Sequence, residues 1–197
     1  MNRKEKSPIL FLIGKMIFKV IFKLFYRWRI EGIENIPKIG GAIIVSRHVS
    51  FFDPPLVGSS IRRPLYFMAK KELFYIPILG WIIKRTNAFP VNRSTSYDIT
   101  ALRNAVSLLK AGSLLLIFPE GTRSKNSKVD VIKAGIGMMA CNAQVPLIPV
   151  KIDNVDVMLK FNKIVIKYGK PIYPPKNFIK NDYITLSQKV LKTIAYM

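Results

Sequence analysis

Short apolar runs alternate with stretches of helical spacing along most of this chain, and this alternation restricts its fold more than any other feature. The runs are rich in β-branched residues and are followed by polar loops, as is typical of buried strands. Strands are expected at residues 29–38 (together with a turn), 41–45, 65–69, 88–93, 114–118, 145–152 and 164–168. Helices are expected at residues 54–60, 97–110, 133–143 and 181–196. Strands that alternate with helices predict an α/β fold with a largely parallel sheet flanked by helices.

Local signals add detail to two of these helices. Ser94 or Ser96 can cap the start of the helix at 97–110, and Gly112 is expected to end it. The single cysteine, Cys141, lies in the helix expected at 133–143, where we interpret it as a small packed hydrophobic residue.

The only histidine of the chain, His48, stands just after the strand expected at 41–45. Asp53 follows it after four intervening residues, where the next helix begins. An imidazole with a carboxylate within reach can act as a general base, because the carboxylate fixes the tautomer and stabilises the imidazolium. The same two residues can equally be a polar turn and a helix cap. The pair alone does not decide between these two interpretations.

Composition limits the classes of partner and site. The 197 residues are enough for one α/β domain, and the net charge of +21 predicts an anionic partner: nucleic acid, a membrane surface or a phosphorylated substrate. One cysteine excludes an intramolecular disulfide and favours a reducing compartment. One histidine and one cysteine exclude a structural zinc site, and neither a metal nor another cofactor is expected.

Residues 8–26 form the most hydrophobic stretch, interrupted at every fourth position by Lys15, Lys19, Lys23 and Arg27. On a helix these cations form one stripe that drifts slowly around the axis. A lysine at the centre of a spanning helix costs about 2.5–3.5 kcal/mol, whereas each apolar residue returns about 0.3–0.6 kcal/mol. We therefore favour a helix that lies in the membrane interface, with the stripe toward the headgroups, over a spanning helix, a signal peptide or a core helix. The division expected is a membrane-associating helix at 1–28 and a catalytic domain at 29–197.

A second apolar run, residues 73–83, is too short to cross a bilayer. It can be part of the core, or a second membrane-facing surface with Trp81 at the interface. The sequence leaves both alternatives open.

Polar residues follow the predicted strands where those strands end. They are His48 and Asp53, Lys70, Arg93, and the group Glu120, Gly121 and Arg123. Residues beyond the carboxyl ends of parallel strands converge on one crevice. A base, a carboxylate and three cations there suit a phosphorylated substrate with a hydroxyl group to activate. No residue has the strand–turn–helix setting of a covalent nucleophile.

Four motif blocks then occur in order. They are His48-x4-Asp53, Phe89-Pro90-Val91-Asn92-Arg93, Phe118-Pro119-Glu120-Gly121-Thr122-Arg123-Ser124 and Val145-Pro146-Leu147-Ile148-Pro149-Val150. Together they resemble the motifs of the glycerophospholipid acyltransferases, and above all of the 1-acylglycerol-3-phosphate (lysophosphatidic acid) acyltransferases. The resemblance covers roughly residues 29–175. It departs at Arg47, where the family commonly has asparagine, and the chain is short for the group.

The resemblance implies a role for each matching residue. His48 would take the proton of the sn-2 hydroxyl of lysophosphatidic acid and Asp53 would orient His48, while the oxygen attacks an acyl thioester directly. Substrate-binding roles would fall to Lys70, Arg93, Glu120, Gly121, Thr122 and Arg123, with the three cations on the phosphate, Glu120 on the glycerol or as a loop brace, and Gly121 giving close backbone approach. Arg47 would add a cation beside the base.

The partners implied are lysophosphatidic acid, an acyl donor that is either acyl-carrier protein or acyl-coenzyme A, and an anionic membrane surface. The expected location is the cytoplasmic face of the cell membrane, as a peripheral or monotopic protein that makes phosphatidic acid for phospholipid biosynthesis. The alternatives are another lysophospholipid or glycerol 3-phosphate as acceptor, a nucleic-acid-binding protein, and a non-catalytic membrane scaffold. Eight of the 32 cations lie in residues 1–29 beside apolar runs, which favours lipid over nucleic acid.

Overall fold

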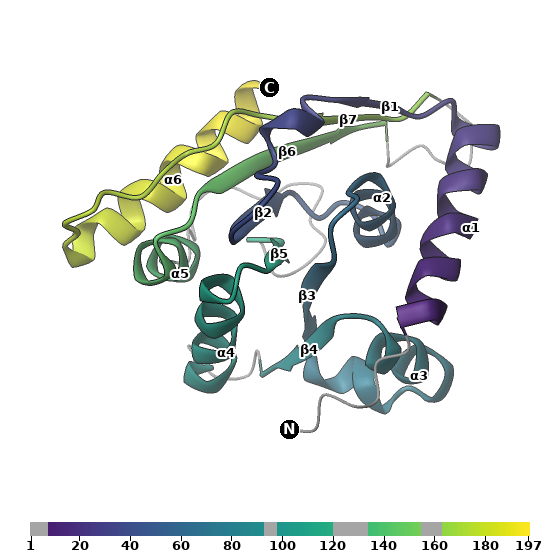
Figure 1. The fold of residues 1–197 in the computed structure, drawn as a ribbon, viewed down its shortest axis with the longest axis horizontal. Coiled ribbons are helices and arrows are strands. Elements are labelled where there is room, and N and C mark those ends of the chain that lie inside the picture. The colour runs from purple at the N-terminus through teal and green to yellow at the C-terminus, as the bar shows by residue number, and fades with distance from the viewer. Residues whose placement is uncertain (1–7, 93–97, 120–133, 155–162) are drawn as a thin grey trace.

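The computed structural model describes residues 8–92, 98–119, 134–154 and 163–197, with side chains from residue 13 onward. Within these residues a seven-stranded sheet has the order β1-β7-β6-β2-β5-β3-β4 (Figure 1). The strands are β1 Arg29–Glu31, β2 Ala42–Ser46, β3 Leu65–Lys70, β4 Ala88–Val91, β5 Leu114–Ile117, β6 Leu147–Asp153 and β7 Val165–Tyr168. The α-helices are α1 Pro8–Tyr26, α2 Asp53–Ser60, α3 Pro77–Arg85, α4 Ile99–Lys110, α5 Gly135–Ala143 and α6 Lys180–Tyr196, and two 3-10 turns are η2 Ile33–Asn35 and η3 Lys71–Tyr75.

The sheet is mostly parallel, which confirms the predicted fold class. β2 pairs in parallel with both β5 and β6, and β3 does so with both β5 and β4. β7 is antiparallel to β6, and β1 runs parallel to β7. The four strands β2, β5, β3 and β4 therefore end at the same edge of the sheet.

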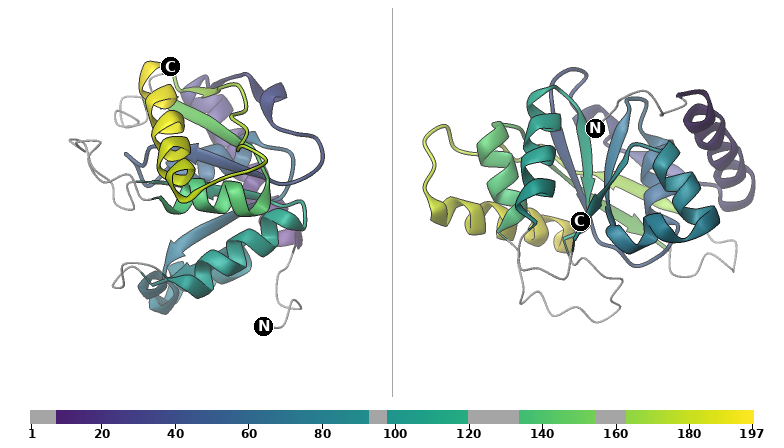
Figure 2. Two further views of the ribbon diagram at one scale, coloured as in Figure 1. Left: turned by 90° about the vertical axis from the view of Figure 1, so that its left-hand side faces the viewer. Right: turned by 90° about the horizontal axis from the view of Figure 1, so that it is seen from below.

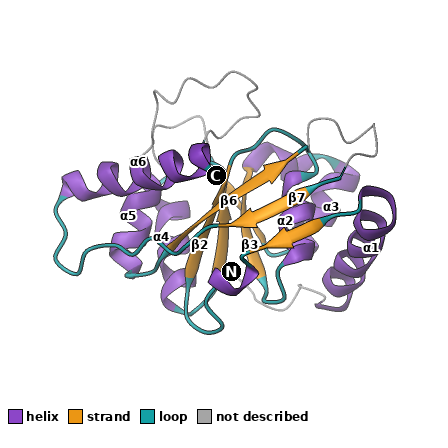
Figure 3. Cartoon of the chain, turned by 90° about the horizontal axis from the view of Figure 1, so that it is seen from above, coloured by secondary structure: helices purple, strands orange, loops and turns teal. Residues whose placement is uncertain are grey.

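Helices cover both faces of the sheet, which explains why its central strands are apolar throughout. Figure 2 and Figure 3 show α4, α5 and α6 on one side and α1, α2 and α3 on the other. Alternate residues of β2 point to opposite faces: Ile43 packs in the core below α4, α5 and α6, and Ile44 packs in the core below α2. Cys141 is fully buried in the first of these cores, as predicted.

The start of α4 corrects one prediction. Asp98, not a serine, caps this helix: its Oδ1 accepts from the Ala101 N–H at 2.9 Å. Its Oδ2 accepts from the Asn92 N–H at 2.9 Å, so one carboxylate ties the end of β4 to the start of α4. These backbone donors, Ala101 first, lower the pKa of Asp98 below its ordinary value. Ser94 and Ser96 lie outside the described residues.

The end of α4 is as predicted. Gly112 follows the helix with a φ of 83°, the left-handed conformation that glycine adopts without strain.

Helix α1 packs on α2 with one face and leaves the other exposed. Phe22 is 1% exposed and packs against the rings of Tyr26 and Trp28. The outward face consists of large apolar residues that are 37–71% exposed: Ile13, Met16, Ile17, Phe18, Val20, Ile21, Leu24 and Phe25. Among the described residues no helix has both the length and the apolar character needed to cross a membrane.

The expected stripe of four cations is divided in the structure. Lys15 turns toward the domain, where its Nζ donates to the carbonyl oxygens of Ile61 and, at 3.2 Å, Arg62, just beyond the end of α2. Burial, and then the neighbouring Lys19, lower the pKa of Lys15. Lys19 and Lys23 stay exposed on the flank of the helix, between its apolar outer face and the domain.

The apolar run at 73–83 forms the end of η3 and most of α3 and is not part of the core. Of the α3 residues, all of which are described, only Gly80 is buried. The core alternative is therefore wrong, because this helix turns its large apolar side chains outward.

Candidate active site

The residues expected in the crevice are attached along one edge of the sheet. His48 lies two residues beyond the end of β2, Phe118 directly follows β5, and Lys70 is the last residue of β3. Because β2, β5 and β3 are consecutive neighbours in the sheet, these three positions follow one another along that edge. This is where parallel α/β sheets bind their ligands.

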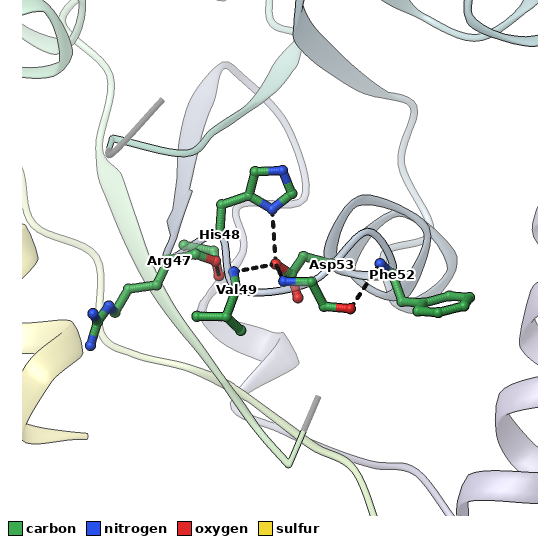
Figure 4. A network of polar contacts seen from close by, with 7 residues as sticks. Arg47, His48, Val49, Phe52 and Asp53 are labelled. Atoms are coloured by element: carbon green, nitrogen blue, oxygen red, sulfur yellow. Dashed lines mark hydrogen bonds and ion pairs between the residues drawn. The ribbon is translucent and has the colours of Figure 1, made fainter. Parts of the chain in front are cut away.

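His48 and Asp53 are in contact. The Nδ1 atom of His48 lies 2.9 Å from Oδ2 of Asp53, and Nε2 lies on the side of the ring that points away from the carboxylate (Figure 4). The His48 side chain is 18% exposed and that of Asp53 is fully buried. A carboxylate at Nδ1 holds the proton on that nitrogen and leaves the Nε2 lone pair for a substrate.

One carboxylate oxygen organises the whole turn between β2 and α2. Besides His48, Oδ2 of Asp53 accepts from the backbone N–H groups of Val49 and Ser50, each at 2.8 Å. The Phe52 N–H donates to Ser50 Oγ at 3.2 Å. Asp53 is also the first residue of α2, where the helix dipole favours a negative charge. The turn and the imidazole therefore depend on the same atom. Asp53 braces the turn that precedes α2 and does not cap the helix, whose N-cap, Phe52, makes no side-chain capping bond.

Phe118 is a part of this site that the sequence did not reveal. Its ring stacks on the His48 imidazole, with the centroids 4.3 Å apart and the planes inclined by 23°. The stacking shields one face of the imidazole and, with the Asp53 bond, limits rotation of the ring. The available signal was the position of Phe118 at the end of the strand next to β2, but pattern alone does not say where a side chain points.

Arg47 and Lys70 do not join the dyad. The Arg47 side chain points away from the imidazole (Figure 4), so Arg47 does not supply the cation that was expected beside the base. The Lys70 side chain is half exposed, and its Nζ lies 3.7 Å from Glu72 Oε1. Among the described residues no group of three or more His, Cys, Asp and Glu side chains lies together to hold a metal.

The other predicted binding residues lie outside the described residues. They are Arg93, Glu120, Gly121, Thr122 and Arg123. The described ends of their segments are Asn92, next to the end of β4, and Pro119, two residues beyond β5. Both attachment points lie at the sheet edge that carries His48.

Comparison with known proteins agrees with this architecture. The Acyltransferase family matches residues 27–153. The 1-acyl-sn-glycerol-3-phosphate acyltransferase of Bacillus subtilis (strain 168) is 31% identical over 160 residues, which cover 79% of this chain and 78% of that protein. A chloroplastic 1-acyl-sn-glycerol-3-phosphate acyltransferase of Arabidopsis thaliana is 33% identical over 140 residues, or 70% of this chain, which spans only 39% of that relative's length.

A solved structure shares the fold. The crystal structure of the 1-acyl-sn-glycerophosphate (LPA) acyltransferase PlsC from Thermotoga maritima superposes with a TM-score of 0.74 at 31% identity, covering 93% of this chain and 77% of that one. The chain therefore belongs to the Acyltransferase family, in the group whose members are named 1-acyl-sn-glycerol-3-phosphate acyltransferases.

Proposed function

We propose that this protein transfers a fatty acyl group from an acyl thioester to the sn-2 hydroxyl of lysophosphatidic acid and so makes phosphatidic acid. The observation that carries the proposal is the 2.9 Å contact between His48 Nδ1 and buried Asp53, at the sheet edge where parallel α/β folds commonly bind ligands. The names of the relatives supply the substrate class.

The chemistry follows from the tautomer that Asp53 selects. Nε2 of His48 accepts the hydroxyl proton while the hydroxyl oxygen attacks the carbonyl carbon of the thioester. A C–O bond forms, the C–S bond breaks, and the leaving thiolate takes the proton back from the imidazolium. The carboxylate of Asp53 stabilises that imidazolium at the moment it forms. No acyl-enzyme intermediate is required, because the substrate oxygen is itself the nucleophile.

The phosphate of the acceptor needs cations beside the dyad. We assign it to Arg93 and Arg123, with Lys70 in a supporting role, and assign the glycerol to Glu120 and the loop that contains Gly121 and Thr122. A guanidinium can hold a phosphate through two parallel hydrogen bonds, which a lysine cannot do. What supports this assignment is that the segments carrying these residues start from the same sheet edge as His48.

Lysophosphatidic acid resides in a bilayer, so the domain must work at a membrane surface. We assign the contact to the outer face of α1, which is apolar and exposed. Lys19 and Lys23, on the flank of the helix, would then lie at headgroup depth on the cytoplasmic face. Each cation near an anionic leaflet contributes about 1 kcal/mol to binding.

The test is acyl transfer by purified protein with lysophosphatidic acid and, separately, acyl-carrier-protein and coenzyme A thioesters. Replacing His48 by alanine should lower kcat by about 10²–10⁴-fold, the usual effect of losing a general base. Lys110→Ala, an exposed change at the opposite edge of the sheet, is the control and should keep wild-type turnover. Phosphatidic acid made by folded His48→Ala protein at an undiminished rate would overturn the assignment. Faster turnover of glycerol 3-phosphate or another lysophospholipid would change the acceptor but not the mechanism.

A further inference from the structure

Helix α3 is an apolar helix whose large side chains have little cover. Its exposed fractions are 78% for Ile78, 49% for Trp81 and 46% for Ile82, and the preceding turn adds Tyr75 at 72% and Ile76 at 47%. Exposed apolar residues are normal when they are scattered singly, but a contiguous group of this size marks an interaction surface.

The cause of this exposure is the way α3 packs. The helix rests mainly on its own leading turn η3, where Gly80 faces the carbonyl of Phe74 so closely that a Cβ at Gly80 would lie 2.4 Å from that oxygen. The absence of a side chain at Gly80 thus lets this face of α3 pack closely against η3. The bulky residues of α3 are consequently left on the outside, and hydrophobic burial among the described residues does not account for them.

Cations border the apolar surface at the end of the helix. Lys84 and Arg85 occupy the last turn of α3, and the Arg85 guanidinium lies 4.0 Å from the centroid of the Trp81 ring. The α3 sequence contains no acidic residue. An indole that combines an apolar body with a polar edge, next to basic residues, is the arrangement favoured at the headgroup level of a membrane.

The position of α3 also fits that role. Its leading turn η3 begins directly after Lys70, at the sheet edge that carries His48. Figure 1 and the right-hand view of Figure 2 place α3 at the same end of the molecule as α1, whose outer face is apolar as well. A bilayer surface at that end of the molecule would meet both helices.

We propose that α3 is a second contact with an anionic phospholipid bilayer, in which Ile78 and Ile82 enter the interface and Trp81 lies at headgroup depth. The proposal rests on the proposed function, because an acceptor that resides in a bilayer is the reason to expect lipid, and not another protein, against the exposed face of α3. Two contacts from separate parts of the chain hold the domain in one orientation, whereas α1 alone would let it rotate about the helix axis. In that orientation the edge with His48 faces the substrate.

Trp81 itself is a reporter of this contact. The chain has two tryptophans, so Trp28→Phe leaves Trp81 as the sole one and keeps an aromatic ring beside Phe22. Vesicles of phosphatidylglycerol and phosphatidylcholine should shift the emission of this full-length protein to the blue. Phosphatidylcholine brominated near the headgroup end of its acyl chains should quench it. Emission that stays unchanged while the protein cosediments with the vesicles would refute the proposal.

Ile78→Ser tests the same contact without a probe. Loss of one inserted isoleucine should weaken vesicle binding about fivefold or more. Ile99→Ser is the matched control, since Ile99 is 60% exposed on α4, on the other side of the sheet, and should leave binding unchanged. Equal binding by wild type and Ile78→Ser would overturn the proposal. So would a dimer in solution that Ile78→Ser dissociates, since a second copy would then be the occupant.

Turnover of detergent-dispersed lysophosphatidic acid separates this idea from the proposed function. Ile78→Ser should match wild type there and fall behind it only on vesicles. If wild type itself failed to transfer acyl groups in detergent, the function would be wrong, and the vesicle-binding result would still decide whether α3 is a lipid contact.

Discussion

Changing Asp53 to asparagine or to alanine should separate the two tasks that its carboxylate performs. Oδ2 accepts from His48 Nδ1 and from the N–H groups of Val49 and Ser50, at 2.8–2.9 Å. Asparagine presents a carbonyl oxygen of nearly the same shape, so it can keep the turn but not the charge. Alanine removes the acceptor from all three donors.

The structure gives the size of the stability effects. A donor left without a partner in a buried place costs about 1–3 kcal/mol, and the partly exposed Val49 and Ser50 N–H groups fall at the low end. Asp53→Ala should therefore lower the free energy of unfolding by about 2–4 kcal/mol. Asp53→Asn loses only the extra strength of charge-assisted bonds and no longer buries a charge, so its loss should stay below about 2 kcal/mol.

The effect of Asp53→Asn on activity should be large even though its effect on stability is small. An amide cannot stabilise the imidazolium and does not fix the tautomer of His48, and a comparable change in a catalytic triad lowers kcat by about 10⁴-fold. Asp53→Asn should therefore lose at least about 10²-fold in kcat while it remains folded. Because the two residues act as a unit, His48→Ala combined with Asp53→Asn should be little worse than His48→Ala alone.

Urea unfolding and kcat measured on the same preparations check both parts. Ser50→Ala is the matched control, because it removes the acceptor of the Phe52 N–H from the same turn without touching the imidazole. Its kcat should stay near wild type. An Asp53→Asn protein with a kcat within threefold of wild type would show that the carboxylate only braces the turn, and the proposed mechanism would fail.

Two further predictions concern the stability of the domain. Gly137→Ala should lower the free energy of unfolding by about 1–3 kcal/mol in urea titrations, because its Cβ would lie 2.0 Å from the Tyr183 carbonyl oxygen. Gly135→Ala in the same helix is the control: its Cβ would meet nothing closer than 3.9 Å, so it should not destabilise the domain. The Tyr168 side chain is buried, and its hydroxyl is hydrogen-bonded to that of Ser60. Burial raises the pKa of Tyr168 well above the ordinary 10.0, so its neutral form contributes stability that is full below pH 10 and is lost as pH rises further. Urea titrations from pH 9 to 11 should therefore show a steeper alkaline loss for wild type than for Tyr168→Phe, and parallel curves would contradict this assignment.

The sequence predicted the fold and the dyad because both depend on local information. Strand and helix periods fix the α/β alternation, and the five-residue step from His48 to Asp53 lies within one turn. Contacts between distant segments escaped prediction. Phe118 reaches His48 because β5 lies beside β2, and Lys15 reaches Ile61, 46 residues away, because α1 lies on α2. Such contacts depend on how the elements pack together, and the helical or strand spacing of apolar residues does not determine that packing.

The cap at α4 shows a different limit. Asp98 and two serines are all acceptable capping residues by type. The geometry selects Asp98 because its second oxygen also binds Asn92 at the end of β4. The capping residue is therefore decided by the position of β4, which a rule based on the residues next to the helix does not include.

The packing of α1 has a practical consequence for the design of shortened or more polar variants of this protein. Phe22 is part of the core, and Lys15 closes the end of the helix that begins with Asp53, so trimming the N-terminus would remove structure that the domain uses. The outward residues Met16, Val20 and Leu24, which are 68%, 50% and 71% exposed, pack little against the rest of the chain. Rewriting these three positions with glutamine or glutamate, and leaving Phe22 and Lys15 in place, would make the outer surface of α1 polar without disturbing the contacts by which the helix packs on the domain.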